Sequence, residues 1–175
     1  MRRILLPFIA LLAVSASLYA ESDESKKETD PPDIYTVTKV IEGDTILLSN
    51  GERVRLIGID CKETEFTRKL VDGKEVRLEY DAEKTDKDGR TLAYVFVDLF
   101  DANGGPLNSG KATPTSWYTN IIGGKYGVFI NATLVKTGYA SPASMPPNVK
   151  YDELFEKLYK QAKEANRGLW KTEVS

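Results

Sequence analysis

The sequence predicts an α+β domain that is mainly β, in which five strands form a barrel and three helices accompany them. Three observations predict this fold class. Short β-branched segments alternate with turns over residues 34–60, and an amphipathic segment covers residues 151–167. The region 34–171 is also long enough for one domain, because domains typically have about 100–150 residues. A charged segment without aliphatic residues, 21–33, separates this domain from residues 1–20.

Residues 1–20 have the features of a secretory signal peptide. Two arginines follow the first methionine, and residues 4–14 form an apolar run that is too short to cross a bilayer. Ala20 is a candidate cleavage residue, Ser17 is a second candidate, and an uncleaved N-terminal anchor is the alternative. We expect an exported protein without stable membrane insertion after processing, in which residues 21–33 are a disordered linker.

The first part of the domain is predicted to be a three-stranded meander. Residues 34–41 are rich in β-branched side chains and end at a Glu-Gly turn. Residues 45–48 form the second strand and residues 53–60 the third. Asn50-Gly51 lies between them and is a strong signal for a two-residue hairpin, because both residue types tolerate positive φ.

A short helix and two further strands follow. Residues 64–72 have the pattern of a helix that Thr64 caps and Gly73 ends. Residues 75–81 and 89–100 read as the fourth and fifth strands, because both are rich in β-branched and aromatic residues.

The last third of the chain combines an insertion with two helices. Residues 101–127 are rich in Gly, Asn, Ser and Thr and are predicted to be an insertion that either buries its own aromatic residues or contacts a partner. A helix over 131–138, capped by Asn131, and the amphipathic helix over 151–167 complete the domain. Five strands with a helix between the third and fourth are the pattern of an OB-fold barrel.

Composition excludes several kinds of catalytic site. The chain of 175 residues contains no histidine and one cysteine, so it has no histidine base, no His-ligated zinc and no internal disulfide. Removing residues 1–20 changes the formal net charge from −2 to −4, because two arginines are lost. Affinity for nucleic acid must therefore come from a local site and not from bulk positive charge.

Two carboxylates are predicted to meet at one end of the meander. Asp44 begins the second strand and Asp60 ends the third, and the Asn50-Gly51 hairpin places these ends side by side. Neighbouring carboxylates repel each other unless a cation lies between them. Oxygen ligands of this kind, supplemented by a backbone carbonyl and water, suit Ca²⁺.

Further charged residues near this position suggest phosphodiester hydrolysis. Glu63 lies three residues beyond Asp60 and is a candidate base for holding and deprotonating a water molecule. Arg55 and Arg90 carry guanidinium groups that match phosphate oxygens. The alternative for each residue taken alone is structural: Asp44 is also a common turn residue, and Arg55 can pair with a carboxylate across the sheet.

The same residues lie in segments that resemble the thermonuclease, or staphylococcal nuclease-like, family. The segments are VIEGDTILL, VRLIGIDCKETE, TDKDGRTLAYVFV, INATLVKTGYA and PPNVKYDELFEKLYKQAKEANRGLW. They cover most of residues 34–171. The resemblance implies an OB-fold enzyme that cleaves single- or double-stranded DNA and RNA with Ca²⁺ and leaves 3′-phosphates, and we expect it to act as a monomer.

The resemblance also assigns roles residue by residue. It implies that Asp44, Asp60 and the backbone carbonyl of Cys61 bind Ca²⁺, and that Glu63 is the general base. Arg55 and Arg90 match the phosphate-binding arginines, and Lys87 remains as a contact to the substrate backbone.

This sequence departs from the family pattern in three places. Lys62 replaces a proline, and the loop after Glu63 is shorter than usual. Tyrosines that pack on the substrate are also missing: Asp88 stands where one is found, and Ala143 and Met145 lie near the others. A non-catalytic or weakly active OB-fold module that binds nucleic acid or a protein is the alternative function.

Overall fold

The computed structural model describes residues 34–98, 119–122 and 125–171, with side chains described over 34–98 and 127–171. The predicted signal peptide and linker lie outside the described residues, as does most of the predicted insertion. The predictions made for those segments therefore stay predictions.

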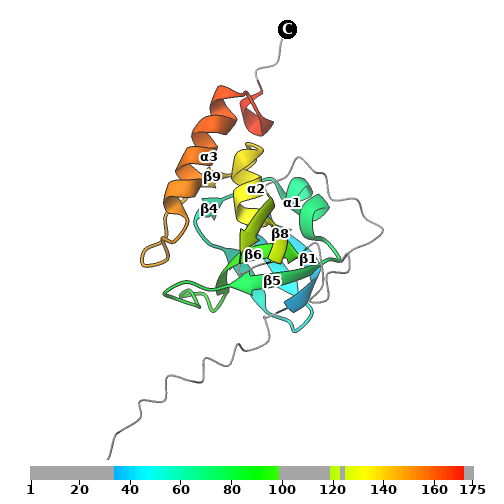
Figure 1. The fold of residues 1–175 in the computed structure, drawn as a ribbon. Coiled ribbons are helices and arrows are strands. Elements are labelled where there is room, and N and C mark those ends of the chain that lie inside the picture. The colour runs from blue at the N-terminus through cyan, green and yellow to red at the C-terminus, as the bar shows by residue number, and fades with distance from the viewer. Residues whose placement is uncertain (1–33, 99–118, 123–124, 172–175) are drawn as a thin grey trace, which may run out of the picture. The chain divides into compact units, whose positions relative to one another are not determined.

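The described residues contain the predicted five-stranded barrel (Figure 1). Its strands are β1 (Ile34–Glu42), β2 (Thr45–Leu48), β3 (Arg53–Leu56), β5 (Glu75–Glu79) and β6 (Thr91–Asp98). They follow the order β3-β2-β1-β5-β6, in which all neighbours are antiparallel, and a parallel pairing between β3 and β6 closes the barrel. The mixed, closed sheet confirms the predicted fold class.

The third predicted strand is shorter than the sequence suggested. It was predicted over 53–60, but β3 ends at Leu56, and a separate two-residue strand, β4 (Ile59–Asp60), pairs with β9 (Ser141–Pro142). Gly58 between them has φ +76°, and a Cβ there would lie 2.6 Å from Cε2 of Phe155. The chain therefore bends at a glycine that both the backbone angle and the packing require, and this bend redirects Asp60 out of the barrel sheet.

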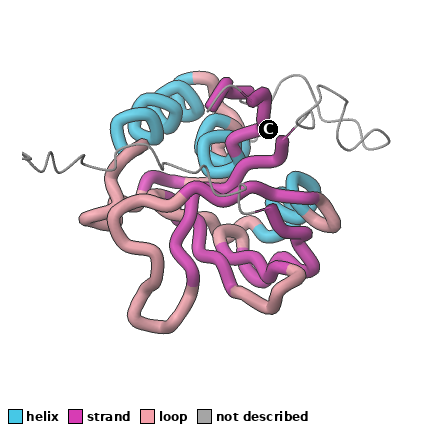
Figure 2. The backbone as a smooth tube through the Cα atoms, turned by 60° about the horizontal axis from the view of Figure 1, so that its bottom comes forward, coloured by secondary structure: helices cyan, strands magenta, loops and turns pink. Residues whose placement is uncertain are grey.

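Three α-helices accompany the barrel, as predicted. They are α1 (Thr64–Val71), α2 (Ile130–Lys136) and α3 (Asp152–Glu164), and a 3₁₀ turn, η1 (Gly168–Trp170), follows α3. The helices α1 and α3 lie on opposite sides with α2 between them, as two views of the fold show (Figure 1, Figure 2). No helix within the described residues has the length and apolar character needed to cross a membrane.

Two helix caps differ from the prediction. Glu63 and not Thr64 caps α1, since its carboxylate accepts a hydrogen bond from the Glu65 backbone N–H. Asn131 does not cap α2, because the helix already begins at Ile130. Its fully buried side chain instead accepts from Val95 N at 3.0 Å and donates to Ile57 O at 2.9 Å. Asn131 thus joins α2 to β6 and to the bend after β3.

Two described parts of the predicted insertion, 119–122 and 125–127, are regular structure. Residues Thr119–Ile122 form β7 and Lys125–Phe129 form β8, and the two strands pair antiparallel. β8 also pairs with β6, so the hairpin extends the barrel sheet by two strands. Residues 101–118 and 123–124 lie outside the described residues, and the prediction of an insertion over 101–127 stays a prediction.

Aromatic side chains fill the space between the barrel and the helices. Phe129 lies 4.5 Å from Phe96 and 5.8 Å from Phe155, measured between ring centroids. Tyr94 and Tyr151 complete the cluster at a centroid distance of 4.6 Å. Because Phe155 belongs to α3 and the others to β6, β8 and the start of α3, this cluster fixes α3 against the barrel.

Replacing Asn131 with alanine tests its internal bridge. We expect the free energy of unfolding to fall by about 2–4 kcal/mol, because two buried backbone groups lose their hydrogen-bond partner. Urea-induced unfolding measures the change, and Gln161→Ala on the exposed surface of α3 is the control, for which a change within about 0.5 kcal/mol is expected. Equal stability of the two variants would contradict the bridging role.

Candidate active site

The carboxylate of Asp44 is a junction between three segments. Asp44 follows the turn after β1 and is 5% exposed. One of its oxygens accepts from the Thr45 hydroxyl at 3.0 Å, and the other accepts from the Cys61 backbone N–H at 3.1 Å and lies 3.2 Å from Nη2 of Arg55. A carboxylate oxygen accepts more than one hydrogen bond, so Asp44 retains capacity for a further ligand.

The carbonyl of Cys61 lies directly against the turn that precedes Asp44. A Cβ built on Gly43 would be 2.3 Å from Cys61 O and 2.7 Å from Cys61 Sγ. Only a residue without a side chain permits this approach. The Thr67 hydroxyl of α1 strengthens it by donating to Gly43 O at 2.6 Å. Gly43, Asp44 and the Asp60–Cys61 peptide therefore form one compact unit.

Arg55 is held by the backbone around it. Its Nη1 donates to Leu56 O at 2.7 Å, and its Nη2 donates to Ile59 O at 2.8 Å while lying beside Asp44. The structural alternative considered for Arg55, an ion pair with a carboxylate on the neighbouring strand, is thus present. The other guanidinium N–H groups have no acceptor among the described residues, so Arg55 still has donors for a phosphate.

The thiol of Cys61 is a buried packing group. Cys61 is 3% exposed, and its Sγ lies 3.3 Å from Tyr139 O and 3.7 Å from Glu63 O. Burial raises the pKa of this thiol above its ordinary value, and the Asp44 carboxylate acts in the same direction. The side chain therefore stays neutral, and any contribution of Cys61 to metal binding must come from its carbonyl oxygen.

Glu63 connects the site to α1. Its carboxylate accepts from Glu65 N at 3.2 Å, so one oxygen is oriented by the first turn of the helix. The side chain is partly exposed. The other carboxylate oxygen has no described partner, which leaves it available to a water molecule.

Arg90 is oriented by carboxylates within its own loop. Asp86 accepts from both the backbone N–H of Arg90 at 2.9 Å and its Nε at 2.7 Å. Burial would raise the pKa of Asp86, but the N–H groups of Arg90 and Asp88 and the charge of Arg90 outweigh it and lower that pKa. Asp88 lies 3.5 Å from Nη2 of Arg90, so a second carboxylate already faces the guanidinium.

The two arginines lie near each other across the parallel pair that closes the barrel. Arg55 of β3 is opposite Leu92 of β6, and Arg90 precedes Leu92 by two residues. Strand spacings of about 3.3 Å per residue and 4.8 Å between strands give a Cα separation of roughly 8 Å. Long arginine side chains at this spacing can reach the oxygens of one phosphate group.

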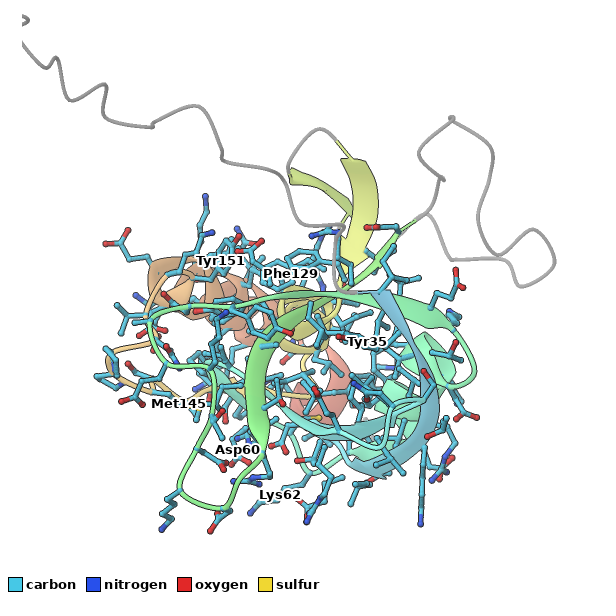
Figure 3. The ribbon with its side chains drawn as sticks, turned by 90° about the horizontal axis from the view of Figure 1, so that it is seen from below. Tyr35, Asp60, Lys62, Phe129, Met145 and Tyr151 are labelled. Atoms are coloured by element: carbon cyan, nitrogen blue, oxygen red, sulfur yellow. The ribbon has the colours of Figure 1, made fainter. Side chains whose placement is uncertain are left out.

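Asp60 and Lys62 lie on a different face from Cys61. Both side chains are exposed, whereas Cys61 between them is buried, as expected for alternation along an extended segment. Figure 3 shows Asp60 and Lys62 close together and away from Phe129 and Tyr151. Lys87 is exposed in the loop before β6 and makes no contact with the other candidate residues among those described.

The structure brings some of the candidate residues together more closely than others. Asp44, Arg55 and the Cys61 backbone are in direct contact, and Asp60 is joined to this unit by its own peptide bond to Cys61. No group of three or more His, Cys, Asp or Glu side chains within the described residues is arranged to hold a metal ion. The available donors are instead two carboxylates and one carbonyl, which are hard oxygen ligands of the type that Ca²⁺ accepts.

Sequence reasoning missed two residues that position this site. Asp86 orients Arg90, and its signal was a carboxylate four residues before the arginine in a tight turn. The close approach of Gly43 to Cys61 had no sequence signal beyond the glycine itself, because it depends on the path of the chain after β3.

The closed barrel with α1 inserted between β4 and β5 belongs to the OB-fold class. A family profile described as "Staphylococcal nuclease homologue" matches residues 53–172. The chain is 34% identical to a thermonuclease of Staphylococcus intermedius and 30% identical to a thermonuclease of Staphylococcus hyicus. Each alignment covers 78% of this chain and 75% of the relative.

A further relative is the SPbeta prophage-derived endonuclease YokF of Bacillus subtilis (strain 168), at 28% identity over 77% of this chain and 43% of YokF. The chain therefore belongs to the staphylococcal nuclease family. Membership of this family, together with relatives that are nucleases, supports a nuclease function.

Substituting Gly43 tests the close approach to Cys61. We expect Gly43→Ala to lower the free energy of unfolding by more than Gly51→Ala, because the new methyl group would meet Cys61 O. Gly51 is the matched control: nothing lies within 4 Å of a Cβ there, and its positive φ alone costs roughly 1–2 kcal/mol. Urea-induced unfolding of both variants measures the difference, and an equal loss would contradict the geometry.

Proposed function

We propose that the protein is an exported, Ca²⁺-dependent phosphodiesterase that hydrolyses DNA and RNA to 3′-phosphate products. The observation that carries this proposal is the contact of the buried Asp44 carboxylate with both Arg55 and the Asp60–Cys61 peptide. That contact gathers carboxylate, carbonyl and guanidinium groups in one place. Metal ligands combined with phosphate-binding groups are suited to phosphodiester hydrolysis.

Asp44, Asp60 and the carbonyl of Cys61 would hold the calcium ion. Their chemistry suits it, because all are oxygen donors and Asp44 has spare accepting capacity. When bound, Ca²⁺ would offset the negative charge of the phosphate and of the attacking oxygen. The compact Gly43–Asp44–Cys61 unit keeps the Asp44 carboxylate and the Cys61 carbonyl in a fixed relation, which lowers the cost of ordering these two donors.

Glu63 would act as the general base. Its helix-capping hydrogen bond fixes the carboxylate, and its free oxygen accepts the proton of a water molecule as that water attacks phosphorus. The bond between phosphorus and O5′ then breaks, O5′ leaves as a hydroxyl after taking a proton from solvent water, and the phosphate stays on the 3′ side. Glu63 orients the water as well as accepting its proton.

Arg55 and Arg90 would bind the phosphoryl oxygens. Both are fixed by existing contacts, Arg55 by backbone carbonyls and Arg90 by Asp86, so little side-chain entropy is lost when substrate binds. They stabilise the charge that develops in the transition state. Lys87, which is exposed, would contact a phosphate further along the strand.

Features of the whole chain support export and action as a monomer. The charged and apolar pattern of residues 1–20 is typical of a signal peptide. The one cysteine is buried, so the fold needs no disulfide and exposes no thiol that would cross-link copies. The large described apolar residues that remain exposed are few: Ile34, Val149 and Leu169.

A weakly active or non-catalytic binding module is the second candidate. It is favoured by Asp88, whose carboxylate lies 3.5 Å from Nη2 of Arg90 and would repel a phosphate. The net charge of −4 that remains after loss of residues 1–20 also favours this candidate, because it weakens the attraction to nucleic acid.

Substitution of the proposed base and phosphate ligand separates these two candidates. We expect Glu63→Gln and Arg90→Ala each to lower kcat for DNA by about 100-fold or more, because proton transfer or charge stabilisation is lost. The glutamine of the first variant would still cap α1 through its amide oxygen, so circular dichroism should report an unchanged fold. Glu65→Gln, in the first turn of α1 and exposed, is the control. Full activity in either variant would refute the assignment of that residue.

Asp88 allows a test in which substrate binding should improve and not weaken. Replacing it with asparagine removes a negative charge beside Arg90 while preserving size, and we expect KM for DNA to fall by about 2- to 5-fold at low ionic strength. The gain should shrink as salt is added, because screening weakens the repulsion. The control is Asp72→Asn, an exposed carboxylate at the end of α1. A salt-independent change in KM would argue against an electrostatic cause.

A further inference from the structure

A pocket of about 280 Å³ lies beside the candidate active site. Its walls come from β4, the segment between α2 and β9, α3 and η1. The lining residues include Asp60, Lys62, Tyr139, Ser141, Tyr159 and Trp170. We call it the Tyr159 pocket. Ligand pockets commonly have volumes of about 300–1,000 Å³, so this one is sized for a single small unit and not for a peptide or a longer strand.

The walls of the Tyr159 pocket are fixed to one another. The backbone N–H of Leu169 in η1 donates to Gly138 O at 3.1 Å, which ties the C-terminal turn to the end of α2. Asp60 and Ser141 are partners in the short β4–β9 ladder. The Tyr159 and Trp170 rings pack edge to face with centroids 5.5 Å apart. The pocket is therefore formed before any ligand binds, which keeps the entropic cost of binding low.

The side chains of the pocket match the chemistry of a nucleotide. Tyr139, Tyr159 and Trp170 provide aromatic surface, on which nucleobases stack irrespective of their sequence. Lys62 is exposed at the wall and forms no ion pair with any described residue, so its ammonium group is available to a phosphate. A second ammonium group, that of Lys163, lies 4.7 Å from the centroid of the Trp170 ring and 5.4 Å from that of the Tyr159 ring, which adds positive charge beside the aromatic wall.

The pocket shares one residue with the proposed metal site and includes the chain neighbour of the proposed base. Asp60 lines the pocket. The backbone N–H of the next residue, Cys61, donates to the Asp44 carboxylate. Lys62 is likewise in the wall and directly precedes Glu63. Asp60, a proposed ligand of the metal, is therefore shared between the pocket and the proposed active site, and a nucleotide in the pocket would lie next to the phosphate that the metal helps to hold.

We infer that the Tyr159 pocket binds a nucleotide of the substrate strand next to the cleaved bond, with the base against Tyr159 and Trp170 and a phosphate on Lys62. This inference rests on the proposed nuclease function. The proposed subsite provides a surface for base stacking that is built from α3 and η1. It lies beside Asp60, which is also a proposed ligand of the metal. Because stacking does not distinguish the bases, the subsite would add affinity without sequence preference.

Two variants test the inference with a pair of substrates. The substrates are a single-stranded oligothymidylate decamer and methyl p-nitrophenyl phosphate, a diester that carries no nucleoside. We expect Lys62→Gln and Tyr159→Leu each to raise KM for the decamer by about 10-fold, with kcat nearly unchanged, since a stacked base or a phosphate contact is lost. Cleavage of methyl p-nitrophenyl phosphate should be unaffected. Lys157→Gln, exposed on α3 and not part of the pocket, is the matched control.

An unchanged KM for the decamer in both variants, or an equal loss on the nucleoside-free diester, would overturn the inference. Lys62 is exposed, so its variant reports on binding even if Tyr159→Leu fails to fold. A second readout separates this failure from failure of the proposed function: fluorescence anisotropy of a fluorescein-labelled decamer with EDTA present. If the unaltered protein does not cleave the decamer but the pocket variants bind it more weakly than the unaltered protein does, the proposed hydrolysis is refuted and the pocket is supported. Normal cleavage with equal binding by all variants refutes the pocket and supports hydrolysis.

Discussion

The hydrogen bond from the Cys61 backbone N–H to the Asp44 carboxylate is the interaction on which the rest of the site depends. It joins the turn after β1 to the segment that leaves the barrel after β3. Arg55 lies against the same carboxylate oxygen and binds the backbone on either side of the bend. Removing either charged partner would leave the other buried and unpaired, which is far more costly than loss of an exposed ion pair.

The bend of the chain between β3 and β4 explains how a stable barrel supports an exposed site. Gly58 permits the bend, and Asn131 binds the carbonyl of Ile57 from inside the fold. Beyond the bend, buried Cys61 fixes the segment to the core while the residues on either side of it face outward. The proposed chemistry thus uses the edge of a rigid element, which holds functional groups more accurately than a free loop does.

Local patterns in the sequence predicted most of the barrel. The features that were not predicted depend on contacts between residues far apart in the sequence. The Asn50-Gly51 turn and the β-branched runs determine the first hairpins through neighbouring residues, so they are legible without a structure. Asn131 was predicted to be a cap because asparagine favours helix starts, but its actual partners are 36 and 74 residues away. The β8 strand was missed because its glycine-rich surroundings resemble a loop, whereas its pairing with β6 and β7 makes it a strand. The hairpin was expected to place Asp44 beside Asp60, but it places the start of β2 beside Arg55, and Asp60 pairs with β9 instead. The helix-capping bond of Glu63 was missed because it depends on where α1 begins.

The central claim is that this acidic and guanidinium cluster hydrolyses nucleic acid when calcium is bound. Its most direct test is incubation of the chain without residues 1–20 with supercoiled plasmid DNA in Ca²⁺, then in excess EDTA, with products followed by gel electrophoresis. The account predicts cleavage in Ca²⁺, no cleavage in EDTA, and recovery of cleavage when Ca²⁺ is restored. Intact plasmid in Ca²⁺, with a folded protein by circular dichroism, would contradict it.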